Sequence, residues 1–431
     1  MSPVSNTRAV TELVKSIKSG DLSSAQLVRD CLHRIESRDN AVQAWACLDR
    51  EYAQAQAGER DEQAQGKWQL PGIPVGIKDI IDTLDLPTAC GTAILDGHRP
   101  VRNAECIERL VAAGAVIMGK TVTTEFAYLQ PGKTRNPHNI EHTPGGSSSG
   151  SAAAVADHQV PMALGTQTAG SIIRPASYCG VVGYKPTFAS FSCRGIHPFA
   201  PSLDTLGGFT RSVADMVLLR NALAGETVKI EALKPASIAL LRGPCWPAAG
   251  DATRSMFEAL QRMSAGWNLP VHRIELGEEF AGINDAQTKI QLKECTRSLG
   301  KYYRHDRERL SAHLCADFEY GLSISDAHMA AAYSLVALCK KSIAGVFNTC
   351  SLILTAASTG TAPEGLGSTG DPVFNRMWTA LGLPCVCLPF PRQEAELPLG
   401  VQLVGAPRGD LALLAHAAWL ERQFLSQNPA R

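Results

Sequence analysis

Two stretches rich in glycine, serine and threonine decide the fold of this chain: PGGSSSGSAAAVA at residues 144–156 and LGTQTAGSIIRPASYCGVVGYKPT at residues 164–187. Neither stretch has the strong periodicity of a core helix or strand. Glycine lets the backbone approach a ligand closely, so such a region is a poor core and a good binding site. We therefore expect these stretches to build the functional site.

Around these stretches, strand patterns and helix patterns alternate along the 431 residues. The sequences SIALL at 237–241, SLILTAAS at 351–358 and GVQLVGA at 400–406 read as buried strands. A closing helix, DLALLAHAAWLERQF, begins at Asp410, which we expect to cap it. This alternation predicts an α/β fold: one large domain, residues 1–431, with a mixed central β-sheet flanked by helices on both faces.

Residues 285–345 differ from the rest, because they are mainly helical and carry the basic and aromatic run GKYYRHDRERL at 300–310. Two interpretations stay open. The region is a solvated helical face, or it is a lid or specificity wall over the site.

Composition excludes several classes of partner. The 41 basic and 41 acidic side chains give a net charge of zero, which leaves no electrostatic footprint for nucleic acid or an anionic membrane. Residues 1–20 lack the apolar core of a signal peptide, and no stretch approaches the roughly 18 uninterrupted apolar residues of a spanning helix. The 13 cysteines are scattered without a C-x-x-C motif, so we expect no metal site and a cytoplasmic protein with reduced thiols.

Three short motif matches point to other classes. Residues 114–121 fit the P-loop pattern, but Ala, Val, Ile and Met between its glycines suit a buried strand better; nucleotide binding remains a rival function. Residues 138–142 read as the zinc-protease pattern H-x-x-E-H, but Pro137 and Pro144 bracket them, so we expect loop histidines. Residues 146–150 fit the nucleophile elbow G-x-S-x-G without a preceding strand, which makes Ser148 the runner-up nucleophile.

A lysine lies on an apolar strand pattern, IPVGIKDII at 73–81. Alternation along that strand places Lys78 on the same face as Gly76 and Ile80. A lysine in this setting is desolvated or paired, and desolvation lowers its pKa. Lys78 is therefore a candidate general base.

These motifs together resemble the amidase signature family. GIPVGIKD is followed in the family's order by GGSSSGSAAAVA, GTQTAGSIIRPASYCG and GYKPT, and then by PSLDTLGGFTRSVADMVLL at 201–219, STGDPVFNRMWTALGLPCVCLP at 368–389 and LPLGVQLVG at 397–405. The resemblance covers essentially the whole chain. It implies the amidase signature fold, with a signature core at about 71–220 and the helical specificity region at about 285–345.

The resemblance also implies a Ser–cis-Ser–Lys catalytic set. Ser171 falls on the nucleophile, Ser147 on the serine that follows a cis peptide bond and bridges protons, and Lys78 on the base. Ser148 falls on a supporting hydrogen-bond partner. This chemistry needs no metal and no cofactor.

By the same resemblance, the backbone N–H groups of Thr168, Ala169, Gly170 and Ser171 form the oxyanion hole. Preorganised donors of this kind each stabilise the transition state by roughly 3–4 kcal/mol. The small side chains in this stretch let a substrate carbonyl approach.

Two departures from the common family pattern concern specificity. Ala169 replaces a glycine, and Arg174 lies three residues after Ser171 rather than two. This arrangement is similar to the malonamidase branch, in which the corresponding arginine holds a substrate carboxylate, as in malonamate. The alternative is a buried arginine paired with an internal acid that braces the loop.

The resulting expectation is an amidohydrolase that cleaves a small-molecule, non-peptide amide through an acyl-serine intermediate. A carbamate or ester hydrolase with the same triad stays open, since acyl-serine chemistry accepts several leaving groups. An amidotransferase A-type subunit is a further alternative, which the departures and the neutral charge weaken. We expect a small-molecule amide as partner, no nucleic acid and no membrane, and the resemblance suggests a homodimer.

Overall fold

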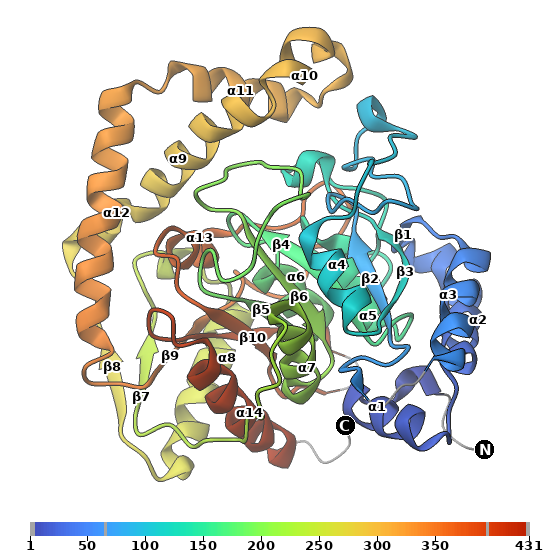
Figure 1. Ribbon diagram of the computed structural model, residues 1–431. Helices are drawn as coiled ribbons and strands as arrows, with labels where there is room; N and C mark the ends of the chain where they lie inside the picture. The colour runs from blue at the N-terminus through green and yellow to red at the C-terminus, as the bar shows by residue number, and fades with distance from the viewer. Residues whose placement is uncertain (1–4, 64–66, 394–395, 428–431) are drawn as a thin grey trace.

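The computed structural model describes residues 5–63, 67–393 and 396–427 (Figure 1). These residues form one mixed sheet of eleven strands in the order β1-β3-β2-β4-β6-β5-β10-β11-β9-β7-β8. The strands are β1 (Trp45–Cys47), β2 (Pro74–Lys78), β3 (Val116–Thr121), β4 (Met162–Gln167), β5 (Val182–Lys185), β6 (Thr205–Thr210), β7 (Ile238–Leu241), β8 (Val271–Ile274), β9 (Leu352–Ala356), β10 (Cys385–Pro389) and β11 (Gly400–Val404). The pairs β3–β2–β4 and β9–β7–β8 are parallel and the others antiparallel. The predicted α/β domain with a mixed central sheet is confirmed.

Helices cover the sheet on both sides. The α-helices are α1 (Val10–Ser19), α2 (Ser24–Val42), α3 (Arg50–Glu62), α4 (Glu105–Ala112), α5 (Ser149–Ala156), α6 (Ile173–Cys179), α7 (Val213–Ala224), α8 (Asp251–Ser264), α9 (Ile283–Ser298), α10 (Gly300–His305), α11 (Ala312–Ser323), α12 (Asp326–Val346), α13 (Val373–Ala380) and α14 (Asp410–Gln427). The 3-10 turns are η1 (Ser5–Thr7), η3 (Ala93–Leu95), η4 (Glu125–Ala127), η5 (Trp246–Ala248), η6 (Ala265–Trp267), η7 (Glu278–Gly282) and η8 (Arg307–Arg309).

Two consecutive glycines of β6 show how the layers are arranged. A Cβ atom at Gly207 would lie 2.9 Å from the side chain of Ile172, directly before α6, and one at Gly208 would lie 2.6 Å from Leu219 of α7. Successive strand residues point to opposite faces, so α6 and α7 lie on opposite sides of the sheet.

The central strands are buried on both faces, which explains why they read as apolar or small-residue runs rather than as alternating patterns. Every residue of β3 is buried, so the P-loop match at 114–121 lies largely within a buried strand, as expected. Residues 138–142 lie in a loop, also as expected. Helix α5 follows residues 146–148, but no strand directly precedes them.

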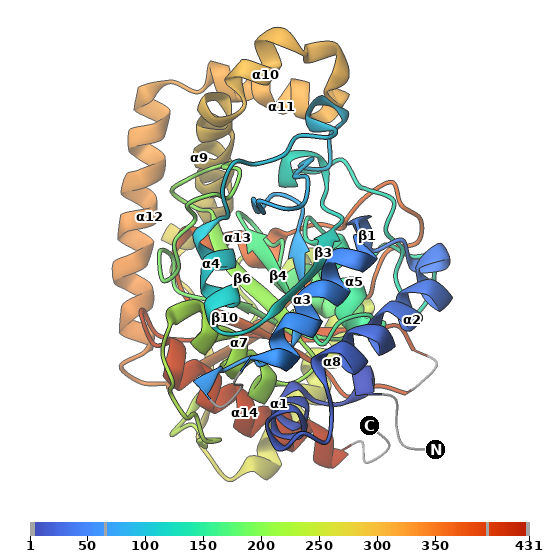
Figure 2. The ribbon, with the colours of Figure 1, turned by 45° about the vertical axis from the view of Figure 1, so that its right-hand side comes forward.

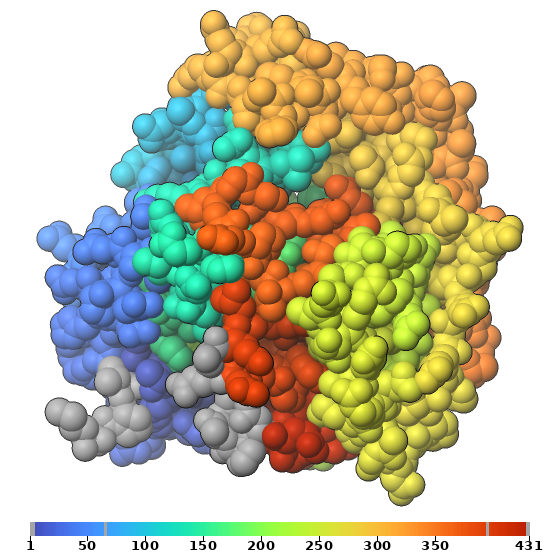
Figure 3. All heavy atoms as spheres, turned by 180° about the vertical axis from the view of Figure 1, so that it is seen from behind, coloured from blue at the N-terminus to red at the C-terminus, as the bar shows by residue number. Residues whose placement is uncertain are grey.

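Residues 285–345 are helical as predicted and form an arm of α9 to α12 that frames the top and one side of the body (Figures 1 and 2). Helix α9 is the inner member and contacts α11, α12 and α13. From behind, the arm, in yellow and orange, again borders the molecule (Figure 3). Helix α12 is long and apolar enough to cross a membrane by length and composition alone, with 28% of its most apolar window buried; core helices pass the same test, so this carries little weight.

Candidate active site

Lys78 ends β2 at the carboxyl edge of the parallel pair β2–β4 and is completely buried. Its Nζ lies 2.8 Å from Ser147 Oγ, 2.9 Å from Thr166 Oγ1 and 3.4 Å from Thr166 O. Burial lowers the pKa of Lys78 to about 7, and the nearby charge of Asp204 opposes that shift. A neutral amine keeps one lone pair, so Lys78 can accept the Ser147 proton while it donates to Thr166.

Ser147 follows a cis peptide bond with Gly146, as the resemblance implies. It is buried, and the next residue supports its surroundings: Ser148 Oγ donates to Thr166 O at 3.3 Å and accepts from Thr166 N at 3.4 Å. Thr166 in turn accepts from Lys78. Ser148 therefore acts on the lysine through Thr166 rather than by direct contact.

Ser171 lies in the short connection between β4 and α6. The side chain of Gln167, the last residue of β4, fixes this connection, because its Oε1 accepts from Ile172 N at 2.9 Å and from Ile173 N at 3.0 Å. Ser171 is 9% exposed, and within the described ranges its hydroxyl makes no hydrogen bond to another protein group. The loop is thus held by its backbone while the hydroxyl stays available.

The carbonyl groups of this loop are bound by two distant helices. Thr168 O accepts from Gln287 Nε2 of α9 at 2.9 Å, and Ala169 O accepts from Thr379 Oγ1 of α13 at 2.7 Å. In a trans peptide the N–H points away from the C=O, so the next two N–H groups point away from these helices. Among the described residues, the N–H groups of residues 169–171 bond to no protein atom. They are suitable donors for an oxyanion.

Asp204, directly before β6, supports the same loop. Its Oδ1 accepts from Thr168 Oγ1 at 2.5 Å, and its Oδ2 accepts from Phe199 N at 2.9 Å and Ala200 N at 3.1 Å. Burial raises the pKa of Asp204 to about 6. The carboxylate therefore anchors the position of Thr168 and places a negative charge near Lys78.

Arg174 is buried and contacts the carbonyl group of the cis peptide between Gly146 and Ser147. Its Nη2 donates to Gly146 O at 2.7 Å and to Thr369 Oγ1 at 3.1 Å, while Nε and Nη1 have no hydrogen-bond partner among the described residues. Burial lowers the pKa of Arg174 to about 10. In the part of the chain that the structure describes, no carboxylate forms an ion pair with it. Arg174 thus braces the loop, but without the internal acid that the second interpretation assumed.

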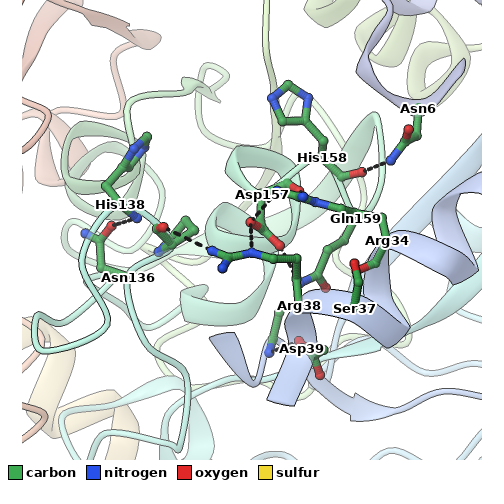
Figure 4. A network of polar contacts seen from close by, with 12 residues as sticks. Asn6, Arg34, Ser37, Arg38, Asp39, Asn136, His138, Asp157, His158 and Gln159 are labelled. Atoms are coloured by element: carbon green, nitrogen blue, oxygen red, sulfur yellow. Dashed lines mark hydrogen bonds and ion pairs between the residues drawn. The ribbon is translucent and has the colours of Figure 1, made fainter. Parts of the chain in front are cut away.

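A separate network holds the far end of α5, the helix that follows Ser147 (Figure 4). Asp157, directly after α5, accepts from Arg34 Nη2 at 2.9 Å and Arg38 Nε at 3.1 Å, both from α2. Gln159 Nε2 donates to its other carboxylate oxygen at 3.0 Å. Helix α2 thereby fixes the position of α5.

Four groups that support the candidate catalytic residues were not predicted from the sequence: Thr166, Asp204, Gln287 and Thr379. Thr166, Asp204 and Thr379 lie inside the stretches that carry the resemblance, so their motif membership was an available signal. Gln287 comes from α9, and no local pattern distinguishes it from an ordinary helix residue.

Comparisons with known proteins agree with this fold. A family sequence model described as Amidase matches residues 26–240. The A-type subunit of the glutamyl-tRNA(Gln) amidotransferase of Lysinibacillus sphaericus is 44% identical over 225 residues, which cover 51% of this chain and 46% of that protein. The corresponding subunit of the Bacillus velezensis enzyme is 33% identical over 470 residues, covering 95% of this chain and 96% of that protein.

Among solved structures, one described as an amidase superposes with a TM-score of 0.89 at 27% identity, covering 97% of this chain and 100% of that one. The fold and the matches together define an amidase-type α/β enzyme acting on C–N bonds. This chain belongs to the amidase signature family.

Proposed function

We propose that this chain is an amidohydrolase that cleaves a small-molecule amide through an acyl intermediate on Ser171. The observation that carries the proposal is the buried Lys78 with its Nζ 2.8 Å from Ser147 Oγ. This pair lies at the edge of the sheet from which the loop of Ser171 continues. A serine hydroxyl is a weak nucleophile until a base removes its proton, and a lysine with a pKa of about 7 supplies that base near neutral pH.

In the proposed reaction, neutral Lys78 takes the Ser147 proton, Ser147 takes the Ser171 proton, and Ser171 Oγ bonds to the amide carbon. The N–H groups of residues 169–171 bind the oxyanion that forms. The C–N bond then breaks, and the amine leaves with a proton returned through Ser147. Water adds to the acyl-serine with the same groups as base, and the carboxylic acid is released.

The test compares Ser171→Ala with wild type on a panel of amides, esters and carbamates that includes malonamate. We expect turnover to fall by roughly 10⁴-fold or more. An acyl adduct on the wild-type protein should appear by intact-mass spectrometry and be absent from the variant. Ser202→Ala, an exposed serine outside the site, is the matched control. Undiminished turnover in Ser171→Ala would overturn the proposal and favour Ser148; the panel also separates amide from ester and carbamate preference.

For the substrate itself, we propose a malonamidase-like compound that carries a carboxylate, which Arg174 binds. The support is a buried guanidinium with two unpartnered nitrogens and no ion-paired acid among the described residues. Arg174→Met should then reduce turnover of malonamate far more than that of propionamide. An equal loss on both substrates would assign Arg174 to bracing Gly146 alone.

A second candidate is an A-type subunit of an amidotransferase, favoured by the relative that matches over 96% of its length. The two candidates differ in what the isolated chain does. Robust hydrolysis of simple amides by the purified chain favours the independent amidase. Negligible turnover that appears only with partner proteins favours the amidotransferase subunit.

A further inference from the structure

A chamber of about 290 Å³ adjoins the candidate catalytic groups. Its inner wall includes Ile80, two residues after Lys78, together with Thr166, whose hydroxyl holds the Lys78 amine. The same wall includes Thr168, at the start of the loop with free N–H groups. A group that fills this chamber would therefore be bound directly beside the reacting centre.

The chamber suits an uncharged, apolar group. Its wall is mostly apolar, with Ile196, Phe199 and Pro201 among the lining residues, and no described lysine or arginine lines it. Asp204 lines it too, but both of its oxygens already accept hydrogen bonds from the protein. A substrate carboxylate would be buried here without a cation and beside a carboxyl group, which is unfavourable.

One segment of the chamber wall is shared with a second hollow. Residues 196–198 line the chamber and also line this second hollow of about 510 Å³, whose other lining residues include the exposed His98 and His305. The single segment 196–198 therefore separates the two spaces. His197 is the central residue of this segment and lines both spaces.

His197 is held in place by an aromatic cluster. Its Nε2 lies 3.3 Å from the hydroxyl of Tyr302 in α10, and its ring centroid lies 5.2 Å from that of Phe126 in η4. The Phe126 and Tyr302 ring centroids are 4.8 Å apart. Burial lowers the pKa of His197 to about 4, so the ring is neutral near neutral pH.

We propose that this chamber is the subsite for an uncharged apolar arm of the amide substrate, and that His197 is the specificity-determining residue that limits the length of that arm. The inference rests on the proposed amide hydrolysis at Ser171. It is compatible with a carboxylate at Arg174, because Arg174 lies against Gly146 rather than in the chamber wall. Substrates with a compact apolar arm are preferred, and long arms meet the His197 partition.

The test measures kcat/KM over two homologous series: primary amides with a growing acyl chain, and N-alkyl acetamides with a growing amine. In the series whose chain enters the chamber, kcat/KM should rise about fourfold per added methylene until the chamber is full and then fall. His197→Ala should move the optimum to longer chains. His305→Ala, a histidine of the outer hollow, should leave it unchanged.

A second variant tests the chamber without changing residues 196–198. Cys193 lines the chamber, and Cys193→Leu places a larger side chain there, which reduces the space for substrate. The optimal chain length should therefore become shorter. If neither variant moves the optimum of either series while Ser171→Ala still abolishes turnover, the chamber is not the subsite and the proposed function stands. If activity survives Ser171→Ala, the proposed function itself has failed. A preference for a carboxylate at the end of the chain that enters the chamber would also overturn the inference.

Discussion

At the scale of the residue, Lys78, the proposed base, would determine at which pH the site is active. Its pKa of about 7 lies below the ordinary value because burial disfavours the charged form, so it is protonated below about pH 7 and a base above it. We predict that kcat/KM rises as pH increases through about 7. The measurement is a pH profile on a neutral amide, whose own charge does not change. A profile with its maximum below pH 6 would contradict a lysine base.

A second residue-scale prediction concerns Asp204, whose negative charge raises the pKa of Lys78. Removing that charge with Asp204→Asn should lower the pKa of Lys78 and move the acidic limb of the pH profile to lower pH. The loss of a charged hydrogen bond to Thr168 should also reduce the free energy of unfolding by about 2 kcal/mol. Asp306→Asn, in the outer hollow, is the control. If the acidic limb of the pH profile does not move while the free energy of unfolding falls, Asp204 anchors Thr168 but does not influence the pKa of Lys78.

The candidate site was partly predictable at this scale. Resemblance brought together Lys78, Ser147 and Ser171, and the structure places Lys78 Nζ within hydrogen-bond distance of Ser147. Asp204 and Gln287 were not assigned, because their importance comes from what they touch. Gln287 lies 119 residues from Thr168 along the chain, and such contacts leave no periodic trace in a sequence.

At the scale of the element, α5 depends on its anchorage to α2. Asp157 is 3% exposed, whereas its partners Arg34 and Arg38 are 36% and 35% exposed. We predict that Asp157→Ala lowers the free energy of unfolding by about 2 kcal/mol, because two charged hydrogen-bond donors lose their acceptor. Denaturant unfolding measures the change, and kcat/KM should fall in parallel because α5 follows Ser147.

The control for this prediction is Glu36, which lies on α2 with Arg34 and Arg38. Glu36 of α2 forms a surface ion pair with Arg50 at 3.7 Å, with both side chains exposed. Such pairs contribute about 0–1 kcal/mol, so Glu36→Ala should change stability little. A similar effect of both substitutions would show that the Asp157 network is no more than surface charge.

Elements with strong local patterns were predicted correctly, including β7 at Ile238–Leu241 and the helices of residues 285–345. The expected cap by Asp410 was wrong. Asp410 begins α14, but its carboxylate accepts from Tyr184 Oη at 2.6 Å and Thr187 N at 2.8 Å, at the end of β5. A local pattern identifies a helix start, but it does not reveal a partner that only the folded sheet brings close. The order of the strands was unpredictable for the same reason.

At the scale of the whole molecule, the helices of the arm differ in how they relate to the candidate site, and a role as specificity wall stays a prediction. Helix α12 keeps one face in solvent, as a solvated helix does. Helix α9 instead reaches the site, because Gln287 donates to Thr168 O at 2.9 Å and accepts from Arg376 Nη1 of α13 at 2.6 Å. The side chain of Gln287 therefore joins the arm to the loop of residues 168–171.

Substitutions of Gln287 test its hydrogen bond to Thr168 O. In Gln287→Glu the side chain keeps its length and its acceptor for Arg376 but replaces the donor to Thr168 O with an oxygen that repels it. We expect kcat to fall roughly tenfold with KM less affected, since a small displacement of oxyanion donors acts mainly in the transition state. Gln287→Ala removes both contacts and should be at least as impaired.

Thr288→Ala, one residue along α9, should behave as wild type, because the Thr288 hydroxyl donates to Asn284 O of its own helix. If Gln287→Glu retains full kcat while Gln287→Ala does not, the contact with Arg376 is the one that matters, and the arm does not hold the loop of residues 168–171 in place. If both variants lose kcat together, Gln287 is a positioning residue. Any movement of α9 relative to the body would then displace the N–H groups of residues 169–171. Substitutions that loosen the packing of the arm would therefore also lower kcat.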